Sequence, residues 1–149
     1  MVNYFLCLMV CVICGRQNAE TEHCKPKEVT VYYIQCNSDQ DRWIEVDDVL
    51  NGFKTSRTKM KFDKGTEVYI KLKSFLSSVE SEPTKEHDRI DVRLVIIFED
   101  GSIRRTIGMD LMGNFLIDGM VYSKSSDLSA LVCSSIPELS CFFCQTEPK

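Results

Sequence analysis

Histidine is scarce in this sequence, and its scarcity bears on catalysis. Of 149 residues only two are histidines, His23 near the N-terminus and His87 in a polar stretch. Nucleophilic catalysis needs a base held beside the nucleophile, and histidine most often supplies it. A glycine-rich phosphate loop and a paired-histidine metal motif are also absent from the sequence. We therefore expect a protein that is not an enzyme, with no cofactor and no metal site.

An excess of basic residues is missing as well. Lys and Arg number 18 against 22 Asp and Glu, which gives a formal net charge of -4. A nucleic-acid-binding domain carries a basic footprint, so we expect no nucleic-acid partner. No Asn-x-Ser/Thr motif occurs, so N-glycosylation is not expected.

One long apolar stretch is present, and it lies at the N-terminus. Residues 1–15 are uncharged and mostly apolar, and Arg16 follows them. The stretch is shorter than the roughly 20 residues that span a bilayer, and it fits the apolar core of a secretory signal. The sequence therefore predicts a signal peptide over 1–15, with cleavage as late as 19, and a secreted, extracellular single β-rich domain over 20–149. The alternative is a buried N-terminal strand or helix.

The cysteines predict disulfides. Three of the eight lie in the predicted signal, which leaves Cys24, Cys36, Cys133, Cys141 and Cys144. The secretory route is oxidising, so we expect these residues to form disulfides. Their odd number leaves one thiol unpaired or bridging two chains, and a disulfide-linked dimer is therefore a further hypothesis. The C-x-x-C spacing of Cys141 and Cys144 also occurs in redox and zinc sites, but the βαβ setting of the redox motif is absent.

Seven short segments have the composition or the period-two alternation of strands. They cover residues 27–35, 43–49, 58–62, 66–73, 89–99, 102–108 and 114–122. Helix signals are sparse by comparison. Many short strands with turns between them are typical of antiparallel sandwiches, so we expect an all-β fold, an antiparallel immunoglobulin-like β-sandwich with disulfides.

The clearest turn is Asp100-Gly101, which lies between two alternating runs and predicts a β-hairpin. A two-residue turn at these positions fixes the register of the two strands. That register places Phe98 opposite Ile103, Leu94 opposite Ile107, and Ile97 opposite Arg104.

Two polar regions suggest binding surfaces. The stretch from Ser77 to Asp88 is long and polar, which is typical of an exposed loop that is mobile or forms part of a binding surface. Between Lys54 and Lys73 seven basic residues occur with few acids, so a basic stripe on neighbouring strands is expected. Such a stripe suits an anionic lipid head group or a glycosaminoglycan, or it is an ordinary solvated face that discourages edge pairing.

Three segments resemble the secreted lipid-recognition (ML) domain family. Cys24 to Cys36 looks like the opening strand of that family between two cysteines, Phe62 to Lys73 resembles its Lys/Arg-Gly element followed by an alternating strand, and Cys133 to Cys141 is similar to its later cysteine pair. Together the three segments cover about a quarter of the chain. The resemblance implies a two-sheet sandwich whose sheets part to admit a lipid or sterol.

If the resemblance holds, apolar residues on the inward faces line the ligand and basic residues form a polar rim. The lining candidates are Val29, Val31, Val68, Ile70, Leu72, Leu94, Ile96 and Phe98. The rim candidates are Lys59, Lys61 and Lys71. Plain core packing is the alternative role for each lining residue.

The leading functional hypothesis is thus a secreted, non-enzymatic binder of a lipid or another apolar ligand. The alternative is a secreted protein-interaction module, a cytokine-like ligand or effector that meets a cell-surface receptor through strand edges and the 77–88 loop. An apolar cavity distinguishes the two, because a carrier needs one whereas an interaction module is packed inside and apolar in patches outside.

Overall fold

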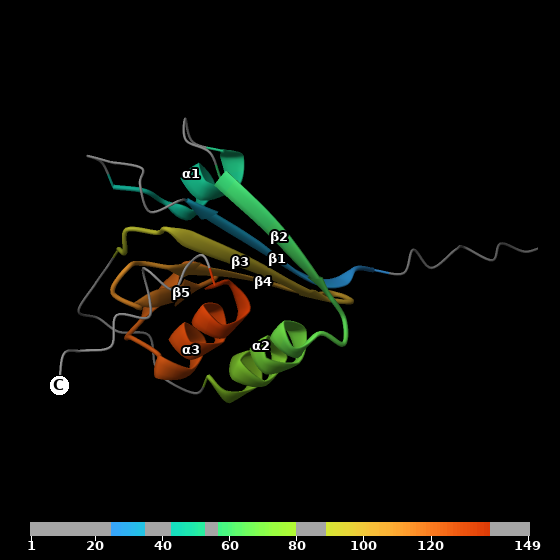
Figure 1. Cartoon of the computed structure of the whole chain (residues 1–149). Coiled ribbons are helices and arrows are strands. Elements are labelled where there is room, and N and C mark those ends of the chain that lie inside the picture. The colour runs from blue at the N-terminus through green and yellow to red at the C-terminus, as the bar shows by residue number, and fades with distance from the viewer. Residues whose placement is uncertain (1–24, 35–42, 53–56, 80–88, 138–149) are drawn as a thin grey trace, which may run out of the picture.

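The computed structural model describes residues 25–34, 43–52, 57–79 and 89–137. Six strands form one antiparallel sheet in the spatial order β2-β1-β3-β4-β5-β6 (Figure 1). The strands are β1 (Lys27–Ile34), β2 (Arg57–Asp63), β3 (Leu94–Asp100), β4 (Ile103–Met109), β5 (Phe115–Ile117) and β6 (Met120–Tyr122). The buried strands β1 and β3 therefore lie inside the sheet, and β2 and β6 form its two borders.

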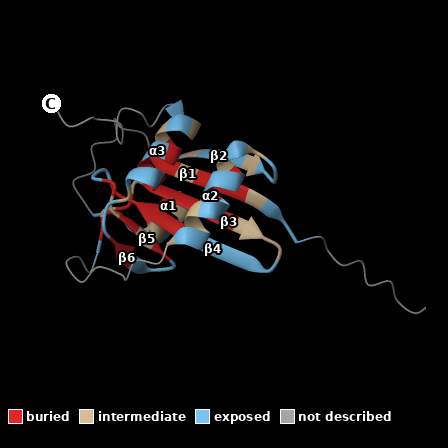
Figure 2. Cartoon of the chain, turned by 90° about the horizontal axis from the view of Figure 1, so that it is seen from below, coloured by how far each residue is buried: buried red, intermediate tan, exposed pale blue. Residues whose placement is uncertain are grey.

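Helices cover both faces of this sheet. Helices α2 (Glu67–Ser78) and α3 (Ser126–Ser135) lie together on one face, and the short helix α1 (Val46–Asn51) lies on the other (Figure 1). Exposed residues follow the outer sides of the helices, whereas the central strands are buried (Figure 2). None of the helices in the described ranges is long and apolar enough to cross a membrane.

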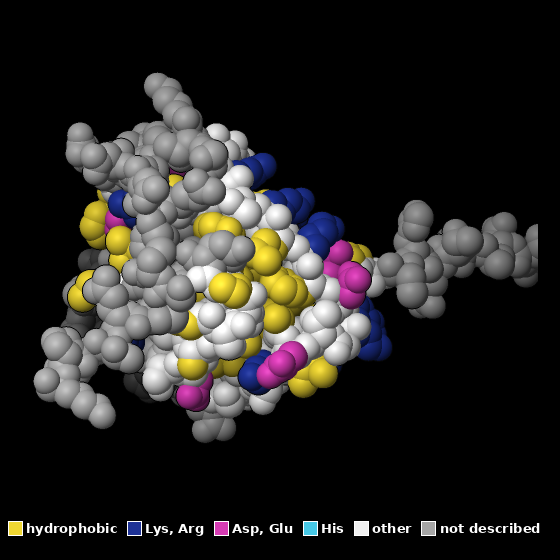
Figure 3. All heavy atoms as spheres, viewed as in Figure 1, with side chains coloured by type: hydrophobic (Ala, Val, Ile, Leu, Met, Phe, Trp, Pro, Cys, Tyr) yellow, Lys and Arg dark blue, Asp and Glu magenta, His cyan; other side chains and the backbone are white. Residues whose placement is uncertain are grey.

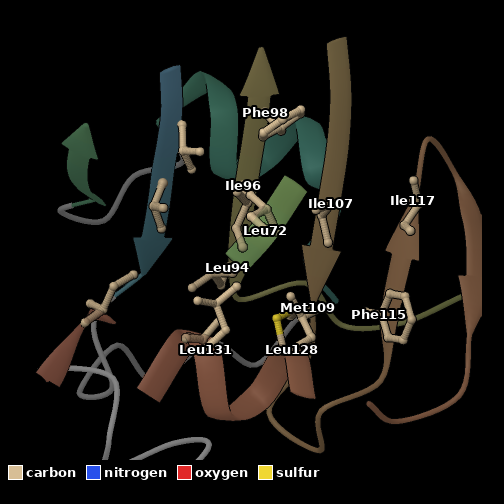
Figure 4. Packing of buried hydrophobic residues seen from close by; sticks show 14 of the residues in the cluster. Leu72, Leu94, Ile96, Phe98, Ile107, Met109, Phe115, Ile117, Leu128 and Leu131 are labelled. Atoms are coloured by element: carbon tan, nitrogen blue, oxygen red, sulfur yellow. The ribbon is translucent and has the colours of Figure 1, made fainter. Parts of the chain in front are cut away.

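Two hydrophobic clusters result from this arrangement, one on each face. The larger cluster lies under α2 and α3, where side chains such as Leu72, Ile96 and Leu128 point toward one another (Figure 4). The smaller cluster lies on the α1 face and includes Val49 and Val95. Because β3 contributes alternate residues to the two clusters, it is buried on both sides.

The predicted antiparallel, β-rich character is confirmed. A second sheet is not found among the described residues, where helices provide the layers that a sandwich would build from strands. The predicted strands over 27–35, 58–62, 89–99 and 102–108 correspond to β1, β2, β3 and β4.

The prediction of a strand over 66–73 is wrong, because these residues begin α2. Thr66 caps the helix with its side chain, which accepts a hydrogen bond from the Tyr69 N–H at 3.3 Å. Residues two apart on a helix point to nearly opposite sides, so Leu72 is fully buried while Ile70 is 58% exposed. The alternation of apolar and polar residues over 66–73 is also compatible with a strand. The N-cap at Thr66 is the local signal that favours the helix.

Two further predicted strands differ in the structure. Part of the 43–49 segment begins α1, which ends at Gly52 in a left-handed conformation with φ 72°. The 114–122 segment forms two strands instead of one, β5 and β6, because the chain turns at Asp118 and Gly119, both with positive φ.

The β3–β4 hairpin is confirmed, but the predicted register is wrong. Phe98 lies opposite Arg105 and Asp100 lies opposite Ile103, so the turn residues are Gly101 and Ser102. Gly101 supplies the positive φ of 65° at the first central position, where a type II′ turn requires glycine. The shift is even, so Leu94, Phe98 and Ile107 still share a face, as predicted.

Candidate functional site

The predicted lining residues lie mainly in the larger hydrophobic cluster. Val29, Val31, Val68, Leu72 and Ile96 surround a common space together with residues of α3, and Leu94 and Phe98 belong to the same cluster. That space has a volume of about 10 Å³, close to the size of a single water site. Ile70 lies apart from the others on the exposed side of α2. The side chains of the cluster thus pack against one another around this small space.

The three predicted rim lysines do not come together. Lys59 and Lys61 lie on β2 and point away from the α2 and α3 face, because their neighbours Met60 and Phe62 pack on that face. Lys71 lies on α2, where its Nζ is 2.6 Å from Glu67 Oε1. A common polar rim is therefore not formed.

A charged cluster joins α2 to the β3–β4 hairpin. Asp100 Oδ2 accepts a hydrogen bond from Lys73 Nζ at 2.6 Å, and Lys27 Nζ lies 3.6 Å from Asp100 Oδ1. The hydrogen bond from Lys73 lowers the pKa of Asp100, and the same bond raises the pKa of Lys73. Burial beside Asp100 raises the pKa of Tyr69. The cluster anchors α2 across the end of the sheet.

Several predicted positions fall outside the described residues. These are the signal peptide, most of the 77–88 loop, the histidines His23 and His87, and the cysteines Cys24, Cys36, Cys141 and Cys144. Cys133 is half-buried on α3 and is disulfide-bonded, and the predicted disulfide framework stays a prediction because the other four cysteines lie outside the described residues. In the part of the chain that the structure describes, no group of three or more metal-ligating side chains occurs.

A pocket of about 190 Å³ opens on the α1 face of the sheet. Its floor is apolar and consists of Ile90, Val92, Leu116 and Val121. Three of these four residues are buried and belong to the smaller hydrophobic cluster. The floor is thus the outer surface of a packed core, where the six-residue helix α1 leaves part of β5 and β6 uncovered.

The rim of this pocket is aromatic and charged. Trp43, the single tryptophan of the chain, is 52% exposed there. Glu45 and Asp47 lie beside it at the start of α1, and Arg89 is the one basic residue among the described residues that line the pocket. No described cation forms an ion pair with either carboxylate. We call this site the Trp43 pocket.

Local hydrogen bonds hold Trp43 in place. The neighbouring residue Ile44 donates its N–H to Asp91 Oδ1 at 2.9 Å, and its carbonyl accepts from the Val92 N–H at 2.9 Å. Asp91 is itself paired with Arg93 at 2.6 Å. The segment before α1 is therefore attached to the segment that leads into β3, and this attachment presents the indole at the surface.

Glycine at position 108 allows α1 to lie close to the sheet. A Cβ atom at Gly108 would stand 3.1 Å from Leu116 Cγ and 3.3 Å from Val46 Cγ2. The lack of a side chain therefore lets Val46 on α1 and Leu116 on β5 pack over β4.

Sequence reasoning missed the Trp43 pocket because it assigned residues 43–49 to a strand. The available signals were Glu45 and Asp48, spaced as a capping box, and Gly52 just after the helix. The contribution of Ile90 and Val121, far apart in the chain, has no local signal, because it depends on the sheet order.

Other exposed features have a different character. A groove of about 460 Å³ runs between α2 and α3, with a lining that includes Ser74, Ser78, Asp127 and Ser134 as well as Phe75. Separately, Met112 is 72% exposed on the β4–β5 loop, which is held by Asp110 through hydrogen bonds from the N–H groups of Met112 and Asn114. The groove also includes the apolar residues Ala130 and Leu131, but neither feature contains a tryptophan.

Comparison of the chain with protein-family models, with characterised proteins and with solved structures found no match. The resemblance to the lipid-recognition domain family therefore stays a prediction, and the site must be interpreted from its own geometry.

Proposed function

We propose that this chain is a non-enzymatic module that binds a partner protein through its surface, with the Trp43 pocket as the anchor site. The observation that carries the proposal is the half-exposed indole of Trp43 beside an apolar floor. Tryptophan is enriched among the residues that dominate binding energy in protein interfaces. A tryptophan fixed at the mouth of a hollow is therefore a suitable contact for a partner side chain.

The size of the pocket favours a protein partner over a small molecule. Small-molecule sites usually enclose about 300–1,000 Å³, whereas the Trp43 pocket encloses about 190 Å³. That volume suits one side chain inserted from a partner surface. Anchoring of this kind, with an apolar side chain in a pocket and polar contacts around it, is typical of protein interfaces.

The charges at the rim indicate which side chains would enter. Glu45 and Asp47 outnumber Arg89 around the opening. A basic residue on the partner would meet these carboxylates, while its apolar neighbour covers Ile90 and Val121. We therefore propose an apolar residue flanked by Lys or Arg as the recognised element, carried on a partner such as a cell-surface receptor.

Lipid binding is the competing proposal from the sequence. In the described structure it would have to use the groove between α2 and α3, whose volume of about 460 Å³ is large enough. The lining of that groove mixes the apolar side chains Phe75, Ala130 and Leu131 with serines and with the charged Lys71 and Asp127. The protein-binding proposal is favoured because the Trp43 pocket carries an exposed tryptophan, which the groove between α2 and α3 lacks.

The test uses a peptide-display library selected against the intact protein. We expect peptides that pair a basic with an apolar residue and shift the fluorescence of Trp43, the single tryptophan of the chain. Substitution Trp43→Ala should weaken binding by about 30-fold, the effect of losing an interface hot spot. Asp47→Lys, at an exposed rim position, should weaken it without disturbing the core. The control Met112→Ala changes an exposed apolar residue elsewhere and should leave the affinity unchanged.

Two results would overturn the proposal. One is a selection that yields no peptide whose binding changes Trp43 fluorescence. The other is a set of peptides whose affinity survives both Trp43→Ala and Asp47→Lys in folded variants.

Secretion is proposed from the sequence alone, since residues 1–15 lie outside the described part of the chain. Expression of the full chain in a secreting host, followed by N-terminal sequencing, tests it. We expect the mature chain to begin at Arg16 or Glu20, and retention of Met1 would contradict the signal peptide.

A further inference from the structure

One border of the sheet is open to strand pairing. The border strand β2 pairs with β1 in an unbroken register from Glu28↔Asp63 to Ile34↔Arg57. The Lys64 N–H donates to the Lys27 carbonyl at 3.0 Å. In this bond the N–H group of Lys64 points toward β1. Because the backbone groups of successive residues point in opposite directions along a strand, the N–H and C=O groups of the even-numbered β2 residues also point toward β1.

The free backbone groups therefore belong to the odd-numbered residues of β2. The N–H and C=O groups of Arg57, Lys59 and Lys61 point away from the sheet, and no described residue forms a hydrogen bond with them. The strand contains no proline and no bulge, two devices that usually block an edge. The described part of the structure thus leaves this edge available to another strand.

Cationic side chains alternate with apolar ones along the same strand. Figure 3 shows Lys and Arg side chains following β2, with hydrophobic side chains beside them. Arg57 and Lys59 lie over the Tyr32 ring, 5.2 and 5.3 Å from its centroid, and Lys61 is paired with Glu28 at 2.7 Å. Lys59 forms no ion pair with a described carboxylate.

The charges distinguish between occupants of the edge. A second copy of β2 would place Arg57 and Lys59 beside cations of the other chain, and like charges on neighbouring strands repel. An acidic residue opposite Lys59 would instead be attracted. On the other face of the sheet, Met60 and Phe62 are only half-buried, so apolar residues of an added strand would cover them.

We propose that β2 accepts an extended segment of a partner protein in which acidic residues alternate with apolar ones, and that this segment adds a seventh strand to the six-stranded sheet. Main-chain hydrogen bonds between β2 and the segment would supply the affinity. The alternation of acidic and apolar residues in the segment would supply the specificity. The edge lies on the opposite border of the sheet from β5 and β6, which contribute to the Trp43 pocket, so the two proposed sites use different strands.

The experiment uses three short synthetic peptides and the intact protein. The first alternates Glu with Val and Thr, the second replaces each Glu with Lys, and the third is the first with N-methyl groups on alternate residues, which block one row of main-chain donors. Affinities come from titration calorimetry. Amide hydrogen exchange shows whether Lys59 and Lys61 become protected.

We expect the acidic peptide to bind about tenfold more tightly than the Lys peptide, from cross-strand charge pairing. N-methylation should abolish binding, and the acidic peptide should protect the Lys59 and Lys61 amides. Lys59→Glu should weaken binding by about tenfold, whereas the matched change Lys71→Glu on α2 should have little effect. Trp43→Ala should also have no effect, so either proposal can fail alone.

Equal binding of the N-methylated and unmodified acidic peptides would show that charge alone is recognised and would overturn strand addition. Failure of the acidic peptide to bind would overturn it as well. Titrations with heparin and with vesicles containing an anionic lipid complete the test. Lys59-dependent binding of either, without binding of the acidic peptide, would assign the basic edge to those ligands instead.

Discussion

The two faces of the sheet are covered to different extents. On one face, the 12-residue α2 and the 10-residue α3 cover a large hydrophobic cluster with an inner space of about 10 Å³, and a groove of about 460 Å³ runs between the two helices at the surface. On the other face, the six-residue α1 covers a smaller cluster and leaves the Trp43 pocket of about 190 Å³. The difference shows that the length of the covering helices determines how much of the hydrophobic cluster beneath them reaches the surface.

Leu72→Ala tests the closed face and should have the largest effect. Leu72 is fully buried between α2 and the sheet, and deleting a buried leucine side chain usually costs about 2–5 kcal/mol. The control is Ile70→Ala on the exposed side of the same helix, which should change the free energy of unfolding by less than about 0.5 kcal/mol. Chemical denaturation measures both. Equal losses would contradict the helix and restore the strand predicted over 66–73.

Gly108→Val tests the open face. The added side chain would collide with Leu116 and Val46, so it should destabilise the protein by about 1–3 kcal/mol and displace α1. Arg104→Val adds the same side chain at an exposed position of β4 and should change stability by no more than about 0.5 kcal/mol. Thermal denaturation compares them, and an unaffected Gly108→Val variant would show that α1 does not pack closely over β4.

Thr66→Ala sharpens the comparison by weakening the start of α2. The Thr66 side chain accepts the hydrogen bond from the Tyr69 N–H, and loss of such a cap costs about 1 kcal/mol. Ser77→Ala, near the exposed end of the same helix, should cost less than about 0.5 kcal/mol. If urea denaturation gives equal values, Thr66 does not cap α2.

The acid dependence of stability tests the link between α2 and the hairpin. The hydrogen bond from Lys73 lowers the pKa of Asp100 in the folded protein, so the ionised carboxylate stabilises the fold above the unfolded-state pKa of about 3.9. This contribution should be lost as the pH falls through the folded-state pKa. The stability difference between the wild type and Asp100→Asn should therefore be constant from about pH 5 to 7 and shrink below about pH 4. A difference that stays constant into strong acid would contradict the lowered pKa.

Much of the sheet could be predicted from the sequence, since hydrophobic alternation and the Gly101 turn are local signals. The same local signals misled the assignment of 66–73, because Val68, Ile70 and Leu72 satisfy a strand pattern while Tyr69 and Leu72 satisfy a helical one. The hairpin register failed for a related reason, as either Asp100-Gly101 or Gly101-Ser102 forms an acceptable two-residue turn.

The candidate site was less predictable than the fold. The Trp43 pocket brings together the start of α1, the entry to β3 and the β5–β6 hairpin. These segments meet only because the sheet order places β5 and β6 next to β4, and that order has no signature in any one segment. Apart from the exposed Ile70, the lining residues inferred from the family resemblance lie in or against the core, since inward-facing apolar residues in a packed core and in a ligand cavity follow the same alternation.

The side chains of the larger cluster pack around a space of about 10 Å³, so we expect the described interior to hold no lipid. Native mass spectrometry of the mature protein, purified from a secreting host, tests this most directly. We expect the mass of the protein alone, with no lipid retained. A stoichiometric co-purifying lipid would contradict it and would favour the carrier hypothesis.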